Sequence, residues 1–328
     1  MTWRALVLSG GGAKGEFQVG ALQCLAENFP EAFDFISGVS VGALNTAILA
    51  QHADLRDGVA QLVQLWESID KNRDVFTGNL TLGALRSLFT RGAVAADSIF
   101  NSHPLARLIA NHVQWNRLVI PFAVGTVSLT DSQYYAITNV PDLLEDFRYP
   151  GQQLQLSLQP GVPGSIPDRI ADFILASASM PLLFPPVDVY GHRFVDGGLR
   201  NVTPLSASVK AARRASVSKR KILIVSTAPA LLPYRSHRLL NSGLEIIERA
   251  LEIMVHEILE NDIQLCMKMN RLAGRRKDLV KIDILHVRPP LNLNLGALEF
   301  DHPARRRQAR ELGYQAMNSL LDEWSRAN

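Results

Sequence analysis

The stretch TWRALVLSGGGAKGEFQVGAL, Thr2 to Leu22, decides the fold. An apolar, β-prone run, Trp3–Ser9, leads into the glycine-rich loop Gly10–Gly15, and helical periodicity follows from Phe17. A glycine loop between a strand and a helix presents backbone N–H groups, and the helix N-terminus favours negative charge. The loop therefore predicts an anion site, for either the phosphate of a bound ligand or an oxyanion formed during a reaction.

The pattern of strand, glycines and helix is repeated at once. A second short strand, Phe33–Ser37, is followed by glycines and another helix, and residues 55–69 form an amphipathic helix. Alternation of this kind predicts parallel strands joined by crossover helices. Further strands are expected at 118–130, 134–138, within 187–198, at 221–227 and at 280–287, and further helices at 102–113, 171–180, from the capping box Ser242–Glu245 onward, and from Pro303 to Trp324.

These elements predict an α/β fold with a mainly parallel central sheet and helices on both faces. We expect a single domain, 1–328, in which the motifs occupy about 5–205 and residues 206–328 complete the same domain. The segment Asn139–Asp168 is rich in Pro, Gly and Gln and is interpreted as a surface insertion.

Composition excludes several classes of protein. The 328 residues are 47% hydrophobic and 20% charged, as in a globular protein, and no apolar run approaches the ~18 residues of a membrane span. No secretory signal is recognised, and the two cysteines, Cys24 and Cys266, are predicted to be reduced, so a cytoplasmic location is expected.

The net charge of +3 is too mild to indicate nucleic-acid binding. Basic residues nevertheless cluster at 210–221, 271–277 and 304–310. These clusters are interpreted either as solvated faces or as a surface for peripheral contact with an anionic membrane.

A nucleotide-binding reading of the first loop is only partly supported. Gly10, Gly12 and Gly15 match G-x-G-x-x-G. The acid expected at the end of the next strand is missing, because Asp34 lies near its start. The phosphate-loop pattern also fails, since Lys14 is followed by glycine and not by Ser or Thr.

The second loop, Gly38-Val39-Ser40-Val41-Gly42, is G-x-S-x-G between a strand and a helix, which is typical of a nucleophile elbow. Neighbouring parallel strands end at the same edge of a sheet, so Ser40 is expected beside the first glycine loop. That loop would then hold the oxyanion formed when Ser40 attacks a carbonyl, and one such N–H donor contributes about 3 kcal/mol.

A serine nucleophile needs a base. The histidines considered, His103, His192, His286 and His302, have no motif around them, and each is interpreted as structural. Asp196 ends a predicted strand immediately before Gly197 and Gly198, although a DGG sequence alone is also typical of a simple turn.

Four blocks occur in order along the chain: GGGAKG, GVSVG, ASASMPLLFPP and DGG. Together they resemble the patatin-like phospholipase family, whose elbow is similar to that of α/β hydrolases and whose dyad is Ser-Asp without histidine. The resemblance implies Ser40 as nucleophile, Asp196 as base and Gly10, Gly11 and Gly12 as the oxyanion hole. It further implies motif support by Lys14, Gly15, Gly38, Gly42, Gly197 and Gly198, with 176–186 as a wall of the site.

The resemblance implies a serine acyl hydrolase that cleaves phospholipid or lysophospholipid esters through an acyl-enzyme, with a lipid ester as its partner and neither cofactor nor metal. Burial beside Phe184 and Phe194 would raise the pKa of Asp196 and make it a better base. The alternatives are a nucleotide-binding α/β protein and a non-catalytic membrane-binding module. The sequence specifies no acyl chain, head group, cleavage position, activator or oligomeric state.

Overall fold

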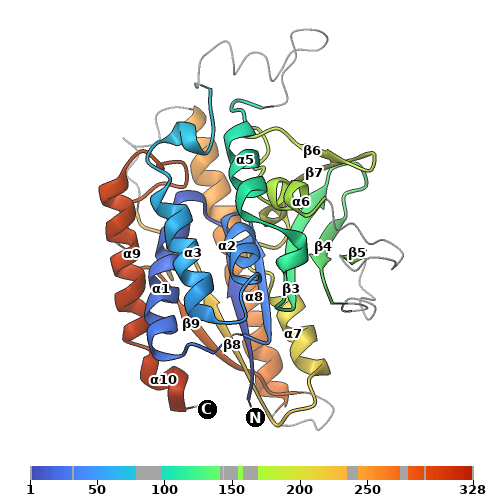
Figure 1. Ribbon diagram of the computed structural model, residues 1–328, viewed down its shortest axis with the longest axis vertical. Coiled ribbons are helices and arrows are strands. Elements are labelled where there is room, and N and C mark those ends of the chain that lie inside the picture. The colour runs from blue at the N-terminus through green and yellow to red at the C-terminus, as the bar shows by residue number, and fades with distance from the viewer. Residues whose placement is uncertain are drawn as a thin grey trace.

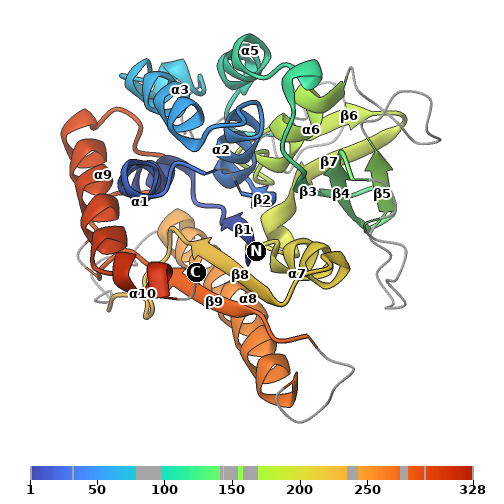
Figure 2. The same ribbon diagram turned by 60° about the horizontal axis from the view of Figure 1, so that its bottom comes forward.

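Among the residues that the structure describes, nine strands form one sheet with helices on both faces (Figures 1 and 2). The computed structural model describes residues 2–31, 33–78, 98–140, 143, 154–157, 169–234, 243–273, 280–291 and 293–326. The strands are β1 (Thr2–Leu8), β2 (Phe35–Val39), β3 (Phe122–Ser128), β4 (Tyr134–Thr138), β5 (Leu154–Ser157), β6 (Val187–Val189), β7 (His192–Asp196), β8 (Lys219–Val225) and β9 (Asp283–Val287).

The sheet has the order β5-β4-β3-β2-β1-β8-β9, and β7 pairs with both β3 and β6. The central pairs, β2 with β3, β1 with β2, β1 with β8 and β8 with β9, are parallel, whereas β4 and β7 run antiparallel to β3. The predicted α/β class is thus confirmed. The late strands β8 and β9 extend the same sheet beyond β1.

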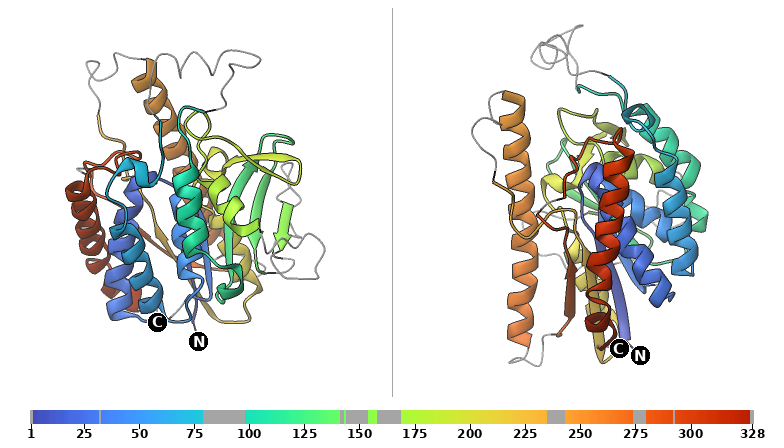
Figure 3. Two further views of the ribbon diagram at one scale, coloured as in Figure 1. Left: turned by 45° about the horizontal axis from the view of Figure 1, so that its top comes forward. Right: turned by 90° about the vertical axis from the view of Figure 1, so that its left-hand side faces the viewer.

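The helices are α1 (Gly15–Asn28), α2 (Val41–Leu49), α3 (Leu55–Glu67), α5 (His103–His112), α6 (Ile170–Ser177), α7 (Leu205–Arg214), α8 (Gly243–Ala273), α9 (Pro303–Asn318) and α10 (Leu321–Arg326), with short 3-10 turns η1 (Gly12–Lys14), η2 (Asn72–Asp74), η3 (Trp115–Arg117) and η5 (Gly197–Leu199). Helices α1, α2, α3, α5 and α6 cover one face of the sheet, and α7 and α8 the other, with α9 beside α1 (Figures 2 and 3).

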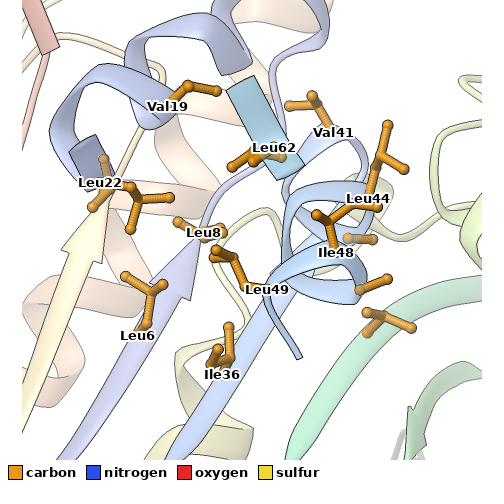
Figure 4. Close-up of a cluster of buried hydrophobic side chains, with 14 of the residues drawn as sticks. Leu6, Leu8, Val19, Leu22, Ile36, Val41, Leu44, Ile48, Leu49 and Leu62 are labelled. Carbon is orange, nitrogen blue, oxygen red and sulfur yellow. The ribbon is translucent and has the colours of Figure 1, made fainter. Parts of the chain in front are cut away.

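Strand β1 is buried on both faces, as a central parallel strand must be. Leu6 and Leu8 point into the core under α1 and α2, whereas Ala5 and Val7 join the core under α7 and α8. Figure 4 shows the first of these clusters, with side chains from β1, β2 and the covering helices meeting between them. Each large apolar side chain buried in this way stabilises the fold by about 1.5–3 kcal/mol.

Several expected elements have other bounds in the structure, and the two largest differences are in β3 and in the last predicted helix. Strand β3 occupies only Phe122–Ser128 of the predicted 118–130, because Pro121 precedes it and a turn follows at Leu129. The last predicted helix is two helices, since α9 ends at Asn318 and α10 begins at Leu321.

Part of the predicted surface insertion, 139–168, is a strand. Residues Leu154–Ser157 form β5, which pairs in parallel with β4 at the edge of the sheet. The rest of the insertion, apart from 139, 140 and 143, lies outside the described residues, as does Ser242 of the predicted capping box.

The basic clusters are partly structural. Arg306 is 4% exposed and donates to the carbonyls of Trp66 and Ile69, while Arg310 donates to the carboxylate of Glu16. Lys221 is also buried and donates to the Trp324 carbonyl. These side chains are therefore not available to a membrane surface.

Two further expectations concern the compartment. Cys24 and Cys266 are both free thiols, as predicted. Within the described ranges, no helix combines the length and the apolar character needed to cross a bilayer.

Candidate active site

Strand β3 brings the predicted nucleophile and base together. The last residue of β2, Val39, pairs with Gly125 of β3, and the last residue of β7, Asp196, pairs with Thr126. The opposite edge of β3 is occupied by β4, so β2 and β7 share one edge and approach each other from opposite directions. Ser40 therefore emerges from β2 at the point where β7 delivers Asp196.

Ser40 has the backbone of a nucleophile elbow. Its φ of 57° and ψ of −127° lie in a region that side-chain-bearing residues rarely adopt, and such a conformation costs about 1–3 kcal/mol. A Cβ on Gly38 would overlap the Gly42 carbonyl, and one on Gly42 would overlap the Leu8 carbonyl. Both flanking glycines are therefore required by the close approach of neighbouring backbone, as the motif predicts.

Asp196 is a buried carboxyl, 2% exposed, that lies close enough to the Ser40 side chain for this side chain to lower its pKa. Its Oδ1 also accepts the Gly198 N–H at 2.7 Å, and its own N–H donates to the Ser179 carbonyl at 2.9 Å. Burial raises the pKa of Asp196 to about 6, although the contacts with Gly198 and Ser40 oppose that rise. The carboxyl is thus more basic than an ordinary aspartate and is still ionised at neutral pH.

The glycine loop faces Ser40. A Cβ placed on Gly10 would lie 3.1 Å from the Ser40 Cβ and 3.8 Å from its Oγ. The Gly10 N–H donates to the Val202 carbonyl at 3.2 Å, whereas the N–H groups of Gly11 and Gly12 have no partner among the described residues. Of the three predicted oxyanion donors, Gly11 and Gly12 therefore have N–H groups to offer in this conformation, and Gly10 has not.

Gly11 and Gly12 also need to be glycine. Their φ values are 155° and 58°, and a Cβ would overlap the Thr227 side chain at the first and the Ala297 carbonyl at the second. Thr227 in turn donates its hydroxyl to the Gly10 carbonyl. The loop is consequently held in one shape by Thr227, which follows β8, and by Ala297 in the segment before α9.

A buried network of polar side chains holds the strand ends that lead to the glycine loop. The Gln18 amide donates to the carbonyls of Ser9 and Val225 at 2.9 and 3.1 Å and accepts from Asn45 at 2.9 Å. Asn45 accepts from the Trp66 ring N–H at 3.1 Å. Satisfied buried networks of this kind fix one arrangement, so α1, α2 and α3 together position the ends of β1 and β8.

The remaining motif residues have separate contacts. Lys14 reaches α8, where its Nζ lies 3.9 Å from Glu252 Oε1. Gly15 lets α1 approach the elbow, since a Cβ there would press on Val41 and Trp66. Gly197 likewise lies against the Gly125 carbonyl.

No histidine among the described residues forms a hydrogen bond with Ser40. His192 does meet a serine and an aspartate, but Ser128 Oγ and Asp131 Oδ2 both approach its Nδ1, at 3.2 and 3.5 Å, so the ring cannot relay a proton between them. His286 contacts the fully buried Ser226 at 2.9 Å, and burial lowers the pKa of His286 to about 3. This favours the dyad over the triad.

Asp34, the acidic residue considered for a nucleotide site, lies away from the glycine loop. Asp34 Oδ2 accepts the Arg4 backbone N–H at 2.7 Å, at the end of β1 opposite the glycine loop. In the part of the chain that the structure describes, no group of His, Cys, Asp and Glu side chains is arranged to hold a metal ion.

A cavity of about 470 Å³ is lined in part by Leu298. Leu298 follows Ala297, whose carbonyl accepts the N–H of Ala13 in the glycine loop at 2.8 Å. The full lining of the cavity is Asn72, Arg73, Phe76, Thr77, Gly78, Phe100 and Leu298. Two of the lining side chains, Phe76 and Phe100, are aromatic, and their rings pack against each other and against Phe184 with centroids 4.7–6.0 Å apart. The volume is in the range of small-molecule pockets, about 300–1,000 Å³.

The sequence model of the patatin-like phospholipase family matches residues 6–208, and the chain belongs to this family. Family membership supports a lipid hydrolase that acts on a lipid substrate. No curated protein sequence matches the chain significantly.

Several solved structures resemble the fold. VipD from Legionella pneumophila is 16% identical with a TM-score of 0.43, over 98% of this chain and 67% of VipD. The type III effector protein ExoU is 13% identical with a TM-score of 0.38, over 98% of this chain and 52% of ExoU. Human GIVD cytosolic phospholipase A2 is 12% identical with a TM-score of 0.29, over 69% of this chain and 41% of that protein.

Several supporting groups were not among the predicted site residues. They are the Val202 carbonyl, the Ser179 carbonyl, Thr227, the Ser177 hydroxyl and the Val41 N–H. The Val41 N–H has no partner within the described ranges, and it follows the nucleophile as oxyanion donors of hydrolase elbows do. Only the Val41 N–H could have been anticipated, from its place in the elbow motif.

Proposed function

We propose that this protein is a serine acyl hydrolase that cleaves carboxylic ester bonds of lipids with Ser40 as nucleophile and Asp196 as base. The observation that carries the proposal is the convergence of Ser40, which follows β2, and the buried Asp196, which ends β7, at neighbouring residues of β3. Burial also raises the pKa of Asp196 to about 6. A base is most effective when its pKa lies near the working pH. An aspartate of this kind can take the Ser40 proton without a histidine between them.

The reaction proceeds in two halves. As Ser40 Oγ bonds to the ester carbonyl carbon, its proton passes to Asp196, and the carbonyl oxygen becomes negative. The N–H groups of Gly11 and Gly12 stabilise this oxyanion, and each such donor contributes about 3 kcal/mol. The C–O bond to the alcohol then breaks, and Asp196 returns the proton to the departing oxygen.

The second half releases the acid. A water molecule gives its proton to Asp196 and attacks the acyl-enzyme carbonyl, the oxyanion forms again, and the bond to Ser40 Oγ breaks as the serine recovers its proton. A free fatty acid leaves, and the dyad is restored. The cavity is suited to the acyl chain, because Phe76, Phe100 and Leu298 give it apolar walls. Leu298 follows Ala297, whose carbonyl binds the loop that would hold the oxyanion.

Hydrolysis of a soluble short-chain ester and of mixed phospholipid vesicles tests this proposal. The wild type should release fatty acid, and Ser40→Ala and Asp196→Asn should be inactive while they remain folded by circular dichroism. An Asp196→Asn variant with near-normal activity would show that another group is the base. A wild type that cleaves no ester would refute the proposed activity.

The proposed cellular location rests on the two free thiols and on the basic side chains of the surface. We infer a reducing, cytoplasmic compartment from the two free cysteines. Any contact with an anionic membrane is peripheral and depends on basic side chains other than Arg306, Arg310 and Lys221. Flotation of the protein with anionic and neutral vesicles at low and high salt measures that contact directly.

A further inference from the structure

The carboxyl end of α6 contacts both members of the dyad. Ser177, the last residue of α6, accepts the Ser40 backbone N–H on its Oγ at 2.9 Å. Two residues later the Ser179 carbonyl accepts the Asp196 N–H at 2.9 Å. Of these two contacts, only the one made by Ser177 uses a side chain, so only that one can be removed by substitution.

The Ser177 hydroxyl has one defined orientation. It is 0% exposed, and it donates to the Gly125 carbonyl at 2.6 Å while it accepts from Ser40. A backbone N–H can only donate and a carbonyl can only accept. The hydroxyl therefore completes a chain of bonds from the elbow to β3, on the residue that pairs with the end of β2.

The hydrogen bonds that link Ser40, Ser177 and Gly125 restrain the strained backbone of Ser40. Ser40 has a φ of 57°, and strained residues of this kind keep their conformation only when their surroundings hold them. The N–H of Ser40 has no other partner in the described part of the structure. Rotation of this peptide would swing Ser40 Oγ away from Asp196 and from the loop at Gly10.

We propose that Ser177 is a positioning residue for the nucleophile: through the Ser40 amide it holds the elbow in the conformation from which Oγ reaches both the substrate carbonyl and Asp196. The inference rests on the proposed function of Ser40. It assigns to the ASAS segment a task in catalysis that is separate from its task as a wall of the site.

Removal of the hydroxyl in Ser177→Ala should lower kcat about 10- to 100-fold, because displacement of a reacting group by about 1 Å costs on the order of 100-fold. KM for a soluble ester should change less than about threefold, since Ser177 touches no substrate. The midpoint of the pH profile of kcat/KM should stay in place, because Asp196 keeps its contact with Gly198. Ser177→Cys retains a weak donor and acceptor and should lie between Ser177→Ala and the wild type.

Ser208→Ala is the matched control. Ser208 is also 0% exposed, and its hydroxyl lies 3.0 Å from Ser37 Oγ on the opposite face of the sheet, away from the dyad. Both alanine variants lose one buried hydroxyl, so their melting temperatures should fall by similar amounts. Ser208→Ala should nevertheless keep kcat within about twofold of the wild type.

Steady-state kinetics on the short-chain ester, together with melting temperatures, test whether Ser177 positions the nucleophile. A kcat loss confined to the Ser177 variants supports the inference, and if Ser177→Ala does not fold, a reduced kcat in folded Ser177→Cys supports it. Equal kcat in Ser177→Ala and Ser208→Ala, or losses that follow melting temperature alone, would overturn it. A wild type inert on every ester would refute the proposed function, and this inference with it.

Discussion

Replacement of Asp196 by Asn is expected to abolish activity and, at neutral pH, to make the protein more stable. The carboxyl is 2% exposed, and burial raises its pKa from 3.8 to about 6. An amide has nearly the same shape, keeps an oxygen for the Gly198 N–H and carries no charge. The cost of burying a charged group therefore disappears in the variant.

The size and the pH range of the effect follow from the two pKa values. Below pH 3.8 the carboxyl is neutral in both folded and unfolded chains, so it makes no ionic contribution. Between 3.8 and about 6 the unfolded chain ionises while the folded protein keeps its proton, so a rise in pH destabilises the wild type. Above about 6 the penalty is constant at about 3 kcal/mol.

Urea denaturation of wild type and Asp196→Asn at about pH 4 and about pH 7.5 measures this difference. The variant should gain about 2–3 kcal/mol relative to the wild type between the two conditions. Asp188→Asn is the control, because the Asp188 side chain is 69% exposed, and its effect should stay within about 0.5 kcal/mol at both pH values. A variant of Asp196 that behaves like this control would refute the reasoning that burial makes Asp196 a base.

Three further outcomes are expected. In the wild type, kcat/KM on a soluble ester should rise with pH to a plateau above about 6, since only the ionised Asp196 accepts a proton; a profile flat between about pH 5 and 8 would contradict this. Gly10→Ala should fold normally but react slowly with a fluorophosphonate, because its Cβ would lie 3.8 Å from the nucleophile oxygen. Gly12→Ala should lose stability, because φ at this position is 58° and the Cβ would overlap backbone. Melting temperatures and labelling rates compare the two variants. Phe100→Trp should fill part of the aromatic cavity and shift ester preference toward shorter acyl chains, and Val119→Trp, at a position 60% exposed, should leave the chain-length profile unchanged.

The parts of the fold that the sequence predicts well are those with a local cause. Strand β4 has the expected bounds, Tyr134–Thr138, because a turn signal precedes a compact β-prone run. Strand β5 was not expected, since its four residues lie in a Gln-rich segment and form a strand only through pairing with β4. The interruption between α9 and α10 falls in the sequence Asn318–Leu321, which contains neither Gly nor Pro.

The candidate site likewise combines features that a local pattern predicts with features that only the structure shows. Ser40 was a candidate because it occupies the G-x-S-x-G motif, and Asp196 because it ends a strand before two glycines. Their meeting depends on the registers of β2 and β7 on β3, which no local pattern specifies. The engagement of the Gly10 N–H by Val202 joins residues almost two hundred positions apart. Ser177 lies in the ASASMPLLFPP block, which the resemblance implies as a wall of the site, but only the structure connects its hydroxyl with the Ser40 amide.

The account depends on one covalent event, the acylation of Ser40 with Asp196 as base. Mass spectrometry of the protein after reaction with a fluorophosphonate tests it most directly. We predict one adduct, on the peptide that contains Ser40, with the labelling rate reduced about 10²- to 10⁴-fold in Asp196→Asn and unchanged in His286→Ala. An adduct on another residue, or undiminished labelling of Asp196→Asn, would contradict the account.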